Sequence, residues 1–149
     1  MEIAIVGADA ERLREAAAVH AFAFASLAAL PTRSWRLLAL APDALGVIPR
    51  GLCADSVLLP GDSDPAAASA LCAGQIIGYG FSPRDTLTLS SFASAERLLC
   101  LQRSLLSLDG TLLEPQELPL PPALAALPEE YALLAAGVRL LCSKNGQSI

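Results

Sequence analysis

Continuous apolar runs recur along the first 80 residues, and most of them stop at a glycine or a proline. Short runs of this kind, bounded by turn residues, are typical of buried strands. The pattern predicts four strands, at Glu2–Val6, Trp35–Ala41, Ser56–Leu59 and Gln75–Tyr79. Strands that are separated by helices are expected to pair in parallel.

Helical patterns separate these runs. A helix is predicted over Ala10–Leu30, with Asp9 placed to cap its start and Pro31 to end it. Its apolar stripe recurs at helical spacing and consists of Leu13, Ala17, His20, Phe24 and Leu27. A second helix is predicted over Ala66–Cys72, because Asp62–Pro65 is a helix-start signal. The alternation indicates a parallel sheet with covering helices.

The period of the pattern changes after Gly80. Leu87 and Leu89 alternate with polar neighbours, which is the two-residue period of a half-buried strand. The dipeptide Asp109-Gly110 lies between two apolar runs and is a strong hairpin signal. Three antiparallel strands are therefore predicted, at Asp85–Phe92, Arg97–Leu108 and Thr111–Leu118.

The chain closes with a proline-rich connector, Pro119–Pro122, and a last helix that opens at Pro128 and ends near Lys144 and Gly146. We find no internal repeat and no linker, so one domain of the α/β class is expected. It would combine a short parallel Rossmann-like sheet and flanking helices with a three-stranded antiparallel sheet. Its parts would be a strand–helix region over 1–80, the antiparallel strands over 81–120 and the C-terminal helix within 121–149.

The charge balance excludes several partners. Ten basic residues stand against 15 acidic ones, a formal net charge of −5. Nucleic-acid binders need a basic surface that displaces counterions, and anionic membranes attract the same kind of surface. The uncharged stretches 16–32 and 65–83 are too short, or too often broken by glycine, for a membrane span. We therefore expect a cytoplasmic protein that binds neither nucleic acid nor membrane.

The four cysteines lie at least 19 residues apart, at Cys53, Cys72, Cys100 and Cys142. Structural metal sites need ligands at short spacing, usually with histidines, and His20 is the single histidine. We expect buried free thiols, with no bound metal and no cofactor. His20 lies on an apolar stripe, so it is expected to be a core or boundary residue and not a general base.

Two turns could carry a ligand. The turn Gly7–Ala10 joins a strand to a helix, where exposed amides could hold a phosphate, although Gly7 and Asp9 equally suit a plain tight turn. The second turn follows Gly78, Tyr79 and Gly80 at the carboxyl end of a predicted parallel strand, where open α/β sheets bind ligands. Arg84 and Asp85 come next, although the two glycines also suit a bend between two layers.

A strand ending in Tyr79-Gly80-Phe81, then Asp85, antiparallel strands, a hairpin and an Ala/Leu-rich helix together resemble the latter part of the Mur ligase central domain. Mur ligases use ATP to join amino acids to muramyl precursors of the bacterial cell wall. The resemblance covers residues 74–140 and carries over structural positions alone, namely Gly78, Tyr79, Gly80 and Asp85. The phosphate loop of the family, with its Gly-Lys-Thr, has no counterpart here, and no catalytic residue transfers.

These observations predict a non-catalytic bacterial protein that binds a protein partner or a small molecule. The expected surface combines Gly78–Asp85 with the turn after Gly7. Two alternatives remain open at this point: a small enzyme acting on a nucleotide-like or phosphorylated substrate, and a homo-oligomeric structural module, such as a homodimer, suggested by the excess of apolar residues.

Overall fold

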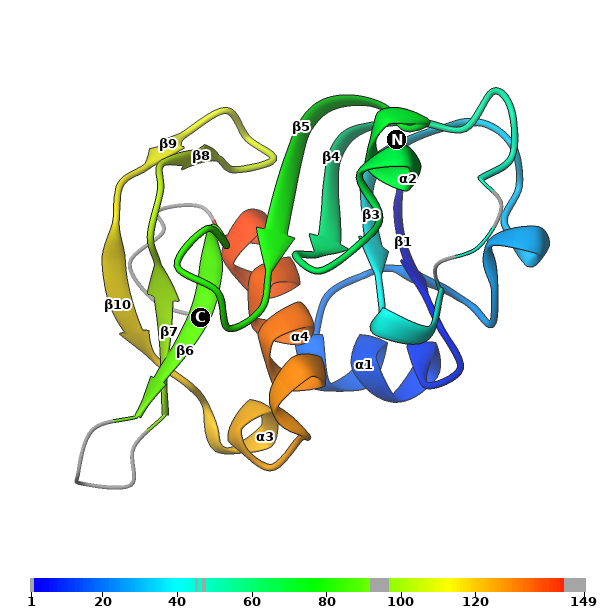
Figure 1. Cartoon of the computed structure of the whole chain (residues 1–149). Coiled ribbons are helices and arrows are strands. Elements are labelled where there is room, and N and C mark those ends of the chain that lie inside the picture. Colours follow the sequence, from blue (N-terminus) through cyan, green and yellow to red (C-terminus); the bar gives the residue numbers. More distant parts are fainter. Residues whose placement is uncertain (1, 45, 47, 92–96, 144–149) are drawn as a thin grey trace.

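The computed structural model describes residues 2–44, 46, 48–91 and 97–143. Strands that lie between Ile3 and Pro119 join in one large sheet (Figure 1). Eight of the described strands form this sheet in the order β10-β7-β6-β5-β4-β3-β1-β2. Their bounds are β1 Ile3–Val6, β2 Phe22–Phe24, β3 Ser34–Leu40, β4 Cys53–Pro60, β5 Cys72–Tyr79, β6 Leu87–Ser91, β7 Arg97–Leu101 and β10 Gln116–Pro119. The protein is therefore of the α/β class, as the alternation of elements predicts.

The pairing changes from parallel to antiparallel at β6, which is parallel to β5 and antiparallel to β7. Strands β2, β1, β3, β4 and β5 run parallel to their neighbours, and β6 joins β5 through the single pair Tyr79–Leu87. From there β6 pairs antiparallel with β7, and β7 pairs antiparallel with β10. The change lies where the hydrophobic period shifts from continuous to alternating.

The prediction of a three-stranded antiparallel sheet that extends the parallel one is confirmed only in part. The antiparallel strands β6, β7 and β10 extend the main sheet, and the second sheet has two strands, β8 (Leu105–Leu106) and β9 (Leu112–Leu113). The predicted strand Arg97–Leu108 is interrupted after Leu101, where Gln102 turns its side chain to bind backbone carbonyls of another loop. The hairpin at Asp109-Gly110 forms as predicted, whereas Phe92 lies outside the described residues.

Two helices cover one face of the sheet, α1 (Ala10–Ala17) and α4 (Glu129–Cys142), and they pack against each other (Figure 1). Their apolar side chains share a core with alternate residues of the strands, such as Ile5, Leu58 and Leu99. The other face buries Trp35, Leu38 and Val57, among others, under shorter segments. These are the 3₁₀ turns η1 (Leu27–Ala29) and η2 (Pro42–Ala44) and the short helix α2 (Pro65–Ser69).

The predicted helix Ala10–Leu30 is wrong beyond Ala17. Ala18 adopts a left-handed conformation (φ 54°), and its N–H bonds to the carbonyls of Arg14 and Glu15, which ends α1. The following segment forms β2, which pairs with β1 at the edge of the sheet. His20 is exposed instead of buried. Pairing with an available sheet edge has overridden a helical pattern, because local propensity is weak compared with tertiary contacts.

Other predicted bounds shift by a few residues. The helix predicted over Ala66–Cys72 ends at Ser69, so that Cys72 starts β5, and the proline-rich connector leads into a short helix α3 (Pro122–Ala125). The last helix starts after Pro128 as expected, whereas Lys144 and Gly146 lie outside the described residues.

The cysteines differ from the expectation of buried thiols. Cys72 is exposed, while the other three are half-buried, and all four are free. No helix within the described ranges is long and apolar enough to cross a membrane.

Candidate functional site

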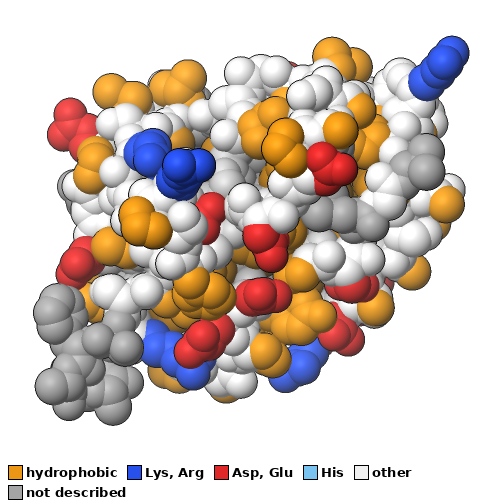
Figure 2. All heavy atoms as spheres, in the orientation of Figure 1, with side chains coloured by type: hydrophobic (Ala, Val, Ile, Leu, Met, Phe, Trp, Pro, Cys, Tyr) orange, Lys and Arg blue, Asp and Glu red, His pale blue; other side chains and the backbone are white. Residues whose placement is uncertain are grey.

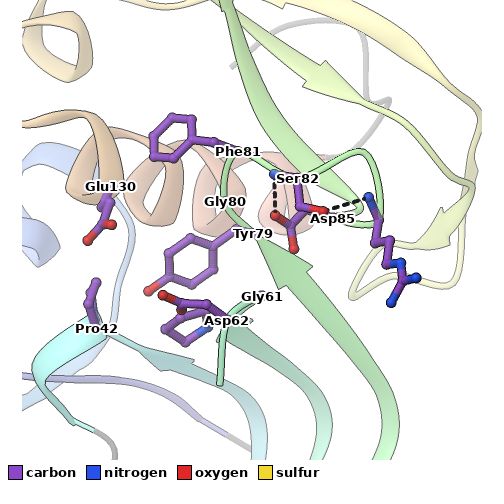
Figure 3. Close-up of a pocket in the computed structure, with 11 residues that line it drawn as sticks. Pro42, Gly61, Asp62, Tyr79, Gly80, Phe81, Ser82, Asp85 and Glu130 are labelled. Carbon is purple, nitrogen blue, oxygen red and sulfur yellow. Dashed lines mark hydrogen bonds between the residues drawn. The ribbon is translucent and has the colours of Figure 1, made fainter. Parts of the chain in front are cut away.

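A cavity of about 540 Å³ opens at the carboxyl edge of the sheet (Figure 3). It lies over the ends of three neighbouring parallel strands and beside the first turn of α4. The residues that line it are Pro42, Pro60, Gly61, Asp62, Tyr79, Gly80, Phe81, Ser82, Arg84, Asp85 and Glu130. We call this cavity the edge pocket.

The topology of the sheet brings these residues together. Pro42 follows β3, and Gly61 and Asp62 follow β4. Tyr79 is the last residue of β5, and the segment 80–85 follows it. Because β3, β4 and β5 are parallel neighbours, their carboxyl ends meet at the same edge. Open α/β sheets bind ligands in crevices at this edge. Glu130 is added from the start of α4, far away in the sequence.

Tyr79 is the buried centre of the pocket wall, with 2% of its surface exposed. Its hydroxyl donates a hydrogen bond of 2.6 Å to the carbonyl of Leu40, which ties the end of β5 to the end of β3. Burial raises the pKa of Tyr79 above its usual range, and the nearby charge of Glu130 adds to the shift. Figure 3 shows the hydroxyl directed toward the side of the pocket where Pro42, Asp62 and Glu130 lie. Tyr79 is therefore neutral and fixed in position.

Asp85 holds the loop between β5 and β6 in shape. Its side chain is buried, with 5% of its surface exposed, and it accepts a hydrogen bond of 3.0 Å from the backbone N–H of Ser82. Gln102 donates to the Asp85 carbonyl from the end of β7, at 2.7 Å. The loop is therefore closed by its own aspartate and tied to the antiparallel strands.

Two glycines make room for this carboxylate. A Cβ atom on Gly61 would lie 1.6 Å from Oδ1 of Asp85, and a Cβ atom on Gly80 would lie 2.6 Å from Oδ2. Both distances are shorter than non-bonded atoms allow, so no side chain fits at either position while Asp85 is in place. The glycines therefore serve the packing of Asp85, which differs from the unusual backbone angles that the structural alternative for this turn assumed.

Arg84 differs from its neighbour because its side chain is exposed. Its backbone N–H donates to the hydroxyl of Ser82 at 3.2 Å, and its carbonyl accepts from Arg103. These contacts hold the backbone and leave the guanidinium as the one basic group among the lining residues.

The structure separates the two turns that the sequence suggested as one surface. Tyr79, Gly80, Arg84 and Asp85 line the edge pocket, whereas Gly7, Asp9 and Gly78 are not among its lining residues. Gly78 lies beneath the pocket, where a Cβ atom would come 3.4 Å from Oδ1 of Asp85.

The turn after Gly7 is closed by a carboxylate of this chain. Oδ2 of Asp43 accepts a hydrogen bond of 2.7 Å from the N–H of Ala8, which is the type of amide that a phosphate would use. The N–H of Gly7 donates to the carbonyl of Phe24. Asp9 precedes α1 and its carbonyl accepts from the N–H of Leu13, but its side chain does not form the cap that the sequence suggested.

Several pocket residues were missing from the sequence prediction. Gly61 and Asp62 directly follow a predicted parallel strand, so the rule that placed Tyr79 in a site could have found them too. No sequence signal indicated that Glu130 lies at the pocket, because its position depends on how α4 packs across the sheet. Glu130 lies in the first turn of the last helix, and the structure adds its place at the pocket.

The pocket is acidic. Its lining holds the carboxylates of Asp62, Asp85 and Glu130 against the guanidinium of Arg84, and contains neither histidine nor cysteine. Figure 2 shows several acidic side chains in the middle of the face that Figure 1 presents. Within the described part of the chain, no three His, Cys, Asp or Glu side chains are grouped so that they could hold a metal ion. The arrangement is suited to binding a polar or cationic molecule.

Comparisons of the chain with protein-family models, with curated proteins and with solved structures found no match.

Proposed function

We propose that this protein binds a small, polar, positively charged molecule, such as an organic amine, in the edge pocket and performs no covalent chemistry on it. The observation that carries the proposal is a cavity of about 540 Å³ with three carboxylates in its wall. Pockets of roughly 300–1,000 Å³ are the usual size of small-molecule sites. Hydrogen bonds between ammonium groups and carboxylates are stronger than bonds between neutral groups.

The rigidity of the wall supports this proposal. The Tyr79 side chain is anchored to Leu40, and Asp85 is locked between glycines, so the pocket keeps its shape without a ligand. Asp62 and Glu130 are exposed side chains at the rim and are free to turn toward a cation. Phe81 is 53% exposed and adds an aromatic surface on which an amine could stack.

A phosphorylated ligand is less well supported. Carboxylates at the pocket repel phosphate, and the N–H of Ala8 already donates to Asp43. We therefore favour a binding protein over an enzyme that acts on phosphorylated substrates.

The proposal also includes the kinship suggested by the sequence. The 2-1-3-4-5 order of the parallel strands supports a Rossmann-like sheet, and the step from Tyr79-Gly80 through Asp85 into antiparallel strands supports the resemblance to the Mur ligase central domain. On this proposal the protein is a relative that has lost the phosphate loop and keeps a binding edge. The four free thiols favour the bacterial cytoplasm, where cysteines stay reduced.

The test is a titration of isotope-labelled protein followed by amide chemical shifts. The ligands would be arginine, spermidine and glucosamine, with ATP and inorganic phosphate as the anionic set. We expect millimolar amines to shift the amides of Gly61–Asp62 and Gly80–Ser82, and the effect to weaken in 1 M salt because exposed charges are screened. Shifts from the phosphates alone, or no shifts at these amides, would refute the proposal.

Matched variants locate the site. Glu130→Gln and Asp62→Asn should each weaken amine binding by about tenfold, because each removes one charge-assisted hydrogen bond. Glu129→Gln is the control for Glu130, since it removes the same charge from the same helix turn at a position outside the pocket lining. Equal losses in Glu129→Gln and Glu130→Gln would mean that only the net charge matters.

A further inference from the structure

Two cysteines lie directly opposite each other at the amino end of the sheet, away from the edge pocket. Cys53 is the first residue of β4 and Cys72 is the first residue of β5, and the two are partners in the parallel register of these strands. Side chains at paired positions of neighbouring strands leave the sheet on the same side. The two thiols are therefore neighbours, although 18 residues separate them along the chain.

The spacing suits a covalent bond. Neighbouring strands lie about 4.8 Å apart, and disulfides join residues whose Cα atoms are about 4.4–6.8 Å apart. The pKa of the Cys53 thiol also indicates that the two side chains interact. A hydrogen bond with the Cys72 side chain, followed by partial burial, raises the pKa of the Cys53 thiol.

The two thiols differ in solvent exposure, and this difference suggests which of them reacts first. Cys72 is exposed and can meet a reagent from solution, whereas Cys53 is half-buried beside it. The other two cysteines have different neighbours. Cys100 pairs in register with Thr88 and Glu117, and Cys142 lies at the end of α4.

From this register and exposure we propose that Cys53 and Cys72 form a reversible intramolecular disulfide, which is a thiol modification site independent of the edge pocket. The oxidant is a low-molecular-weight disulfide of the glutathione class. The Cys72 thiolate attacks oxidised glutathione, forms a mixed disulfide and releases one glutathione thiolate. The Cys53 thiolate then attacks the Cys72 sulfur and releases the second glutathione. Two protein thiols are oxidised, one glutathione disulfide is reduced to two thiols, and both protons go to the thiolates released or to solvent.

The bond would join the first residues of the two strands on either side of α2. The same strands end at Pro60 and Tyr79, which line the edge pocket. The bond would therefore close the unit β4–α2–β5 covalently at the end that lies away from the pocket. Exposed disulfides are among the more easily reduced ones, and Cys72 is exposed. The pair is therefore suited to cycling between dithiol and disulfide and less suited to permanent cross-linking.

The sequence makes the bond simple to detect. Trypsin cuts after Arg50 and Arg84 and at no position between them, so residues 51–84 form one peptide that holds Cys53 and Cys72 and no other cysteine. The native protein would be equilibrated with mixtures of reduced and oxidised glutathione at pH 8, quenched in acid and digested. We expect this peptide to lose the mass of two hydrogens. Cleavage before Asp55 or Asp62 should then leave its halves connected until a reductant is added.

The decisive measurement compares folded and unfolded protein. The equilibrium constant for disulfide formation would be measured in buffer and again in 8 M urea. If the fold holds the thiols together, the constant in buffer should exceed that in urea by at least tenfold, because the unfolded chain must close the loop at an entropic cost. An equal or smaller constant in buffer would overturn the proposal, as would glutathione adducts or cross-linked dimers as the main products.

Two variants complete the test. Cys72→Ser removes an exposed thiol and should abolish the mass loss in peptide 51–84, while Cys100→Ser should leave it unchanged. Loss of the signal in Cys100→Ser would show that the oxidation proceeds through another cysteine, which contradicts the assigned pair.

Discussion

Two glycine-containing turns lie at the carboxyl edge of the sheet, and an aspartate holds each of them in a different way. In the turn after Gly7, Asp43 reaches over from the segment after β3 and accepts from Ala8 at 2.7 Å, in an exposed position. In the loop after Gly80, Asp85 belongs to the loop that it closes, and its carboxylate is 95% buried. One carboxylate remains in contact with water, while the other is part of the packing.

The difference shows what glycine contributes at each place. Gly7 has a positive φ of 154° and approaches the side chain of Ala41, so backbone geometry requires it. Gly61 and Gly80 have ordinary backbone angles, and they are required because the Asp85 carboxylate fills the space where a side chain would be. The second turn is thus a packed unit that supports the pocket, whereas the first is a surface turn closed by a hydrogen bond.

The largest expected effect tests this packing. Gly61→Ala should lower the free energy of unfolding by about 3 kcal/mol, because the new methyl group collides with Asp85. In a protein that already carries Asp85→Ala, the same substitution should cost less than about 1 kcal/mol. Urea unfolding followed by the fluorescence of Trp35, the single tryptophan and fully buried, measures both. Equal costs in the two backgrounds would show that Asp85 does not decide the need for glycine.

The second prediction compares the two aspartates directly. Asp85→Ala should cost about 2–3 kcal/mol, because it removes a buried carboxylate from the packing and leaves the N–H of Ser82 without its part-buried partner. Asp43→Ala should cost less than about 1 kcal/mol, because water can replace the carboxylate at the exposed Ala8. The same urea titrations compare the two variants, and a larger loss for Asp43→Ala would reverse our description of the two turns.

Tyr79 connects the two regions and provides a pH-dependent test. Tyr79→Phe should cost about 1–2 kcal/mol at neutral pH, because the carbonyl of Leu40 loses its buried donor. Since the folded-state pKa of Tyr79 is raised, its contribution is complete below the unfolded pKa of about 10 and is lost as the pH rises above it. The stability difference between wild type and Tyr79→Phe should therefore shrink between pH 9 and pH 11 in urea titrations. A constant difference would mean that the Tyr79 hydroxyl is open to water.

The smallest effect concerns a third turn of the same kind, at Asp109-Gly110. Asp109 is exposed and accepts hydrogen bonds from the Ser107 hydroxyl and from the N–H of Thr111, which lower its pKa to about 2. This contribution is complete above the unfolded pKa of about 3.9 and is lost as the pH falls toward 2. Amide exchange of Thr111 should therefore accelerate below pH 4 in wild type beyond its intrinsic rate, and Asp109→Asn should lack this acid-dependent step.

Local signals predicted much of the fold. The apolar runs located β1, β3, β4 and β5, and Asp109-Gly110 located the hairpin. Each of these elements depends on interactions within a few residues, or on burial that an apolar run indicates directly. The change of period after Gly80 likewise marked the place where the pairing turns antiparallel.

Interactions between segments that are far apart in the sequence explain the predictions that were wrong. The segment 19–30 has helical spacing, yet Phe22–Phe24 pairs with β1, because a free parallel edge offers backbone partners that the helix pattern does not reveal. For the same reason, the sequence predicted some residues of the edge pocket and missed others. Tyr79, Gly80, Arg84 and Asp85 share one loop, whereas Asp62 and Glu130 come to it from other elements.

The amino-acid sequence by itself determined the α/β class, the strand ends at glycine and proline, and the net negative charge. Only the tertiary structure decided that Asp85 is a buried support, that Asp43 closes the turn after Gly7, and that Cys53 faces Cys72. The physical reason is that periodicity records which side of an element is buried, while distances between elements depend on strand order and register, which no local pattern encodes.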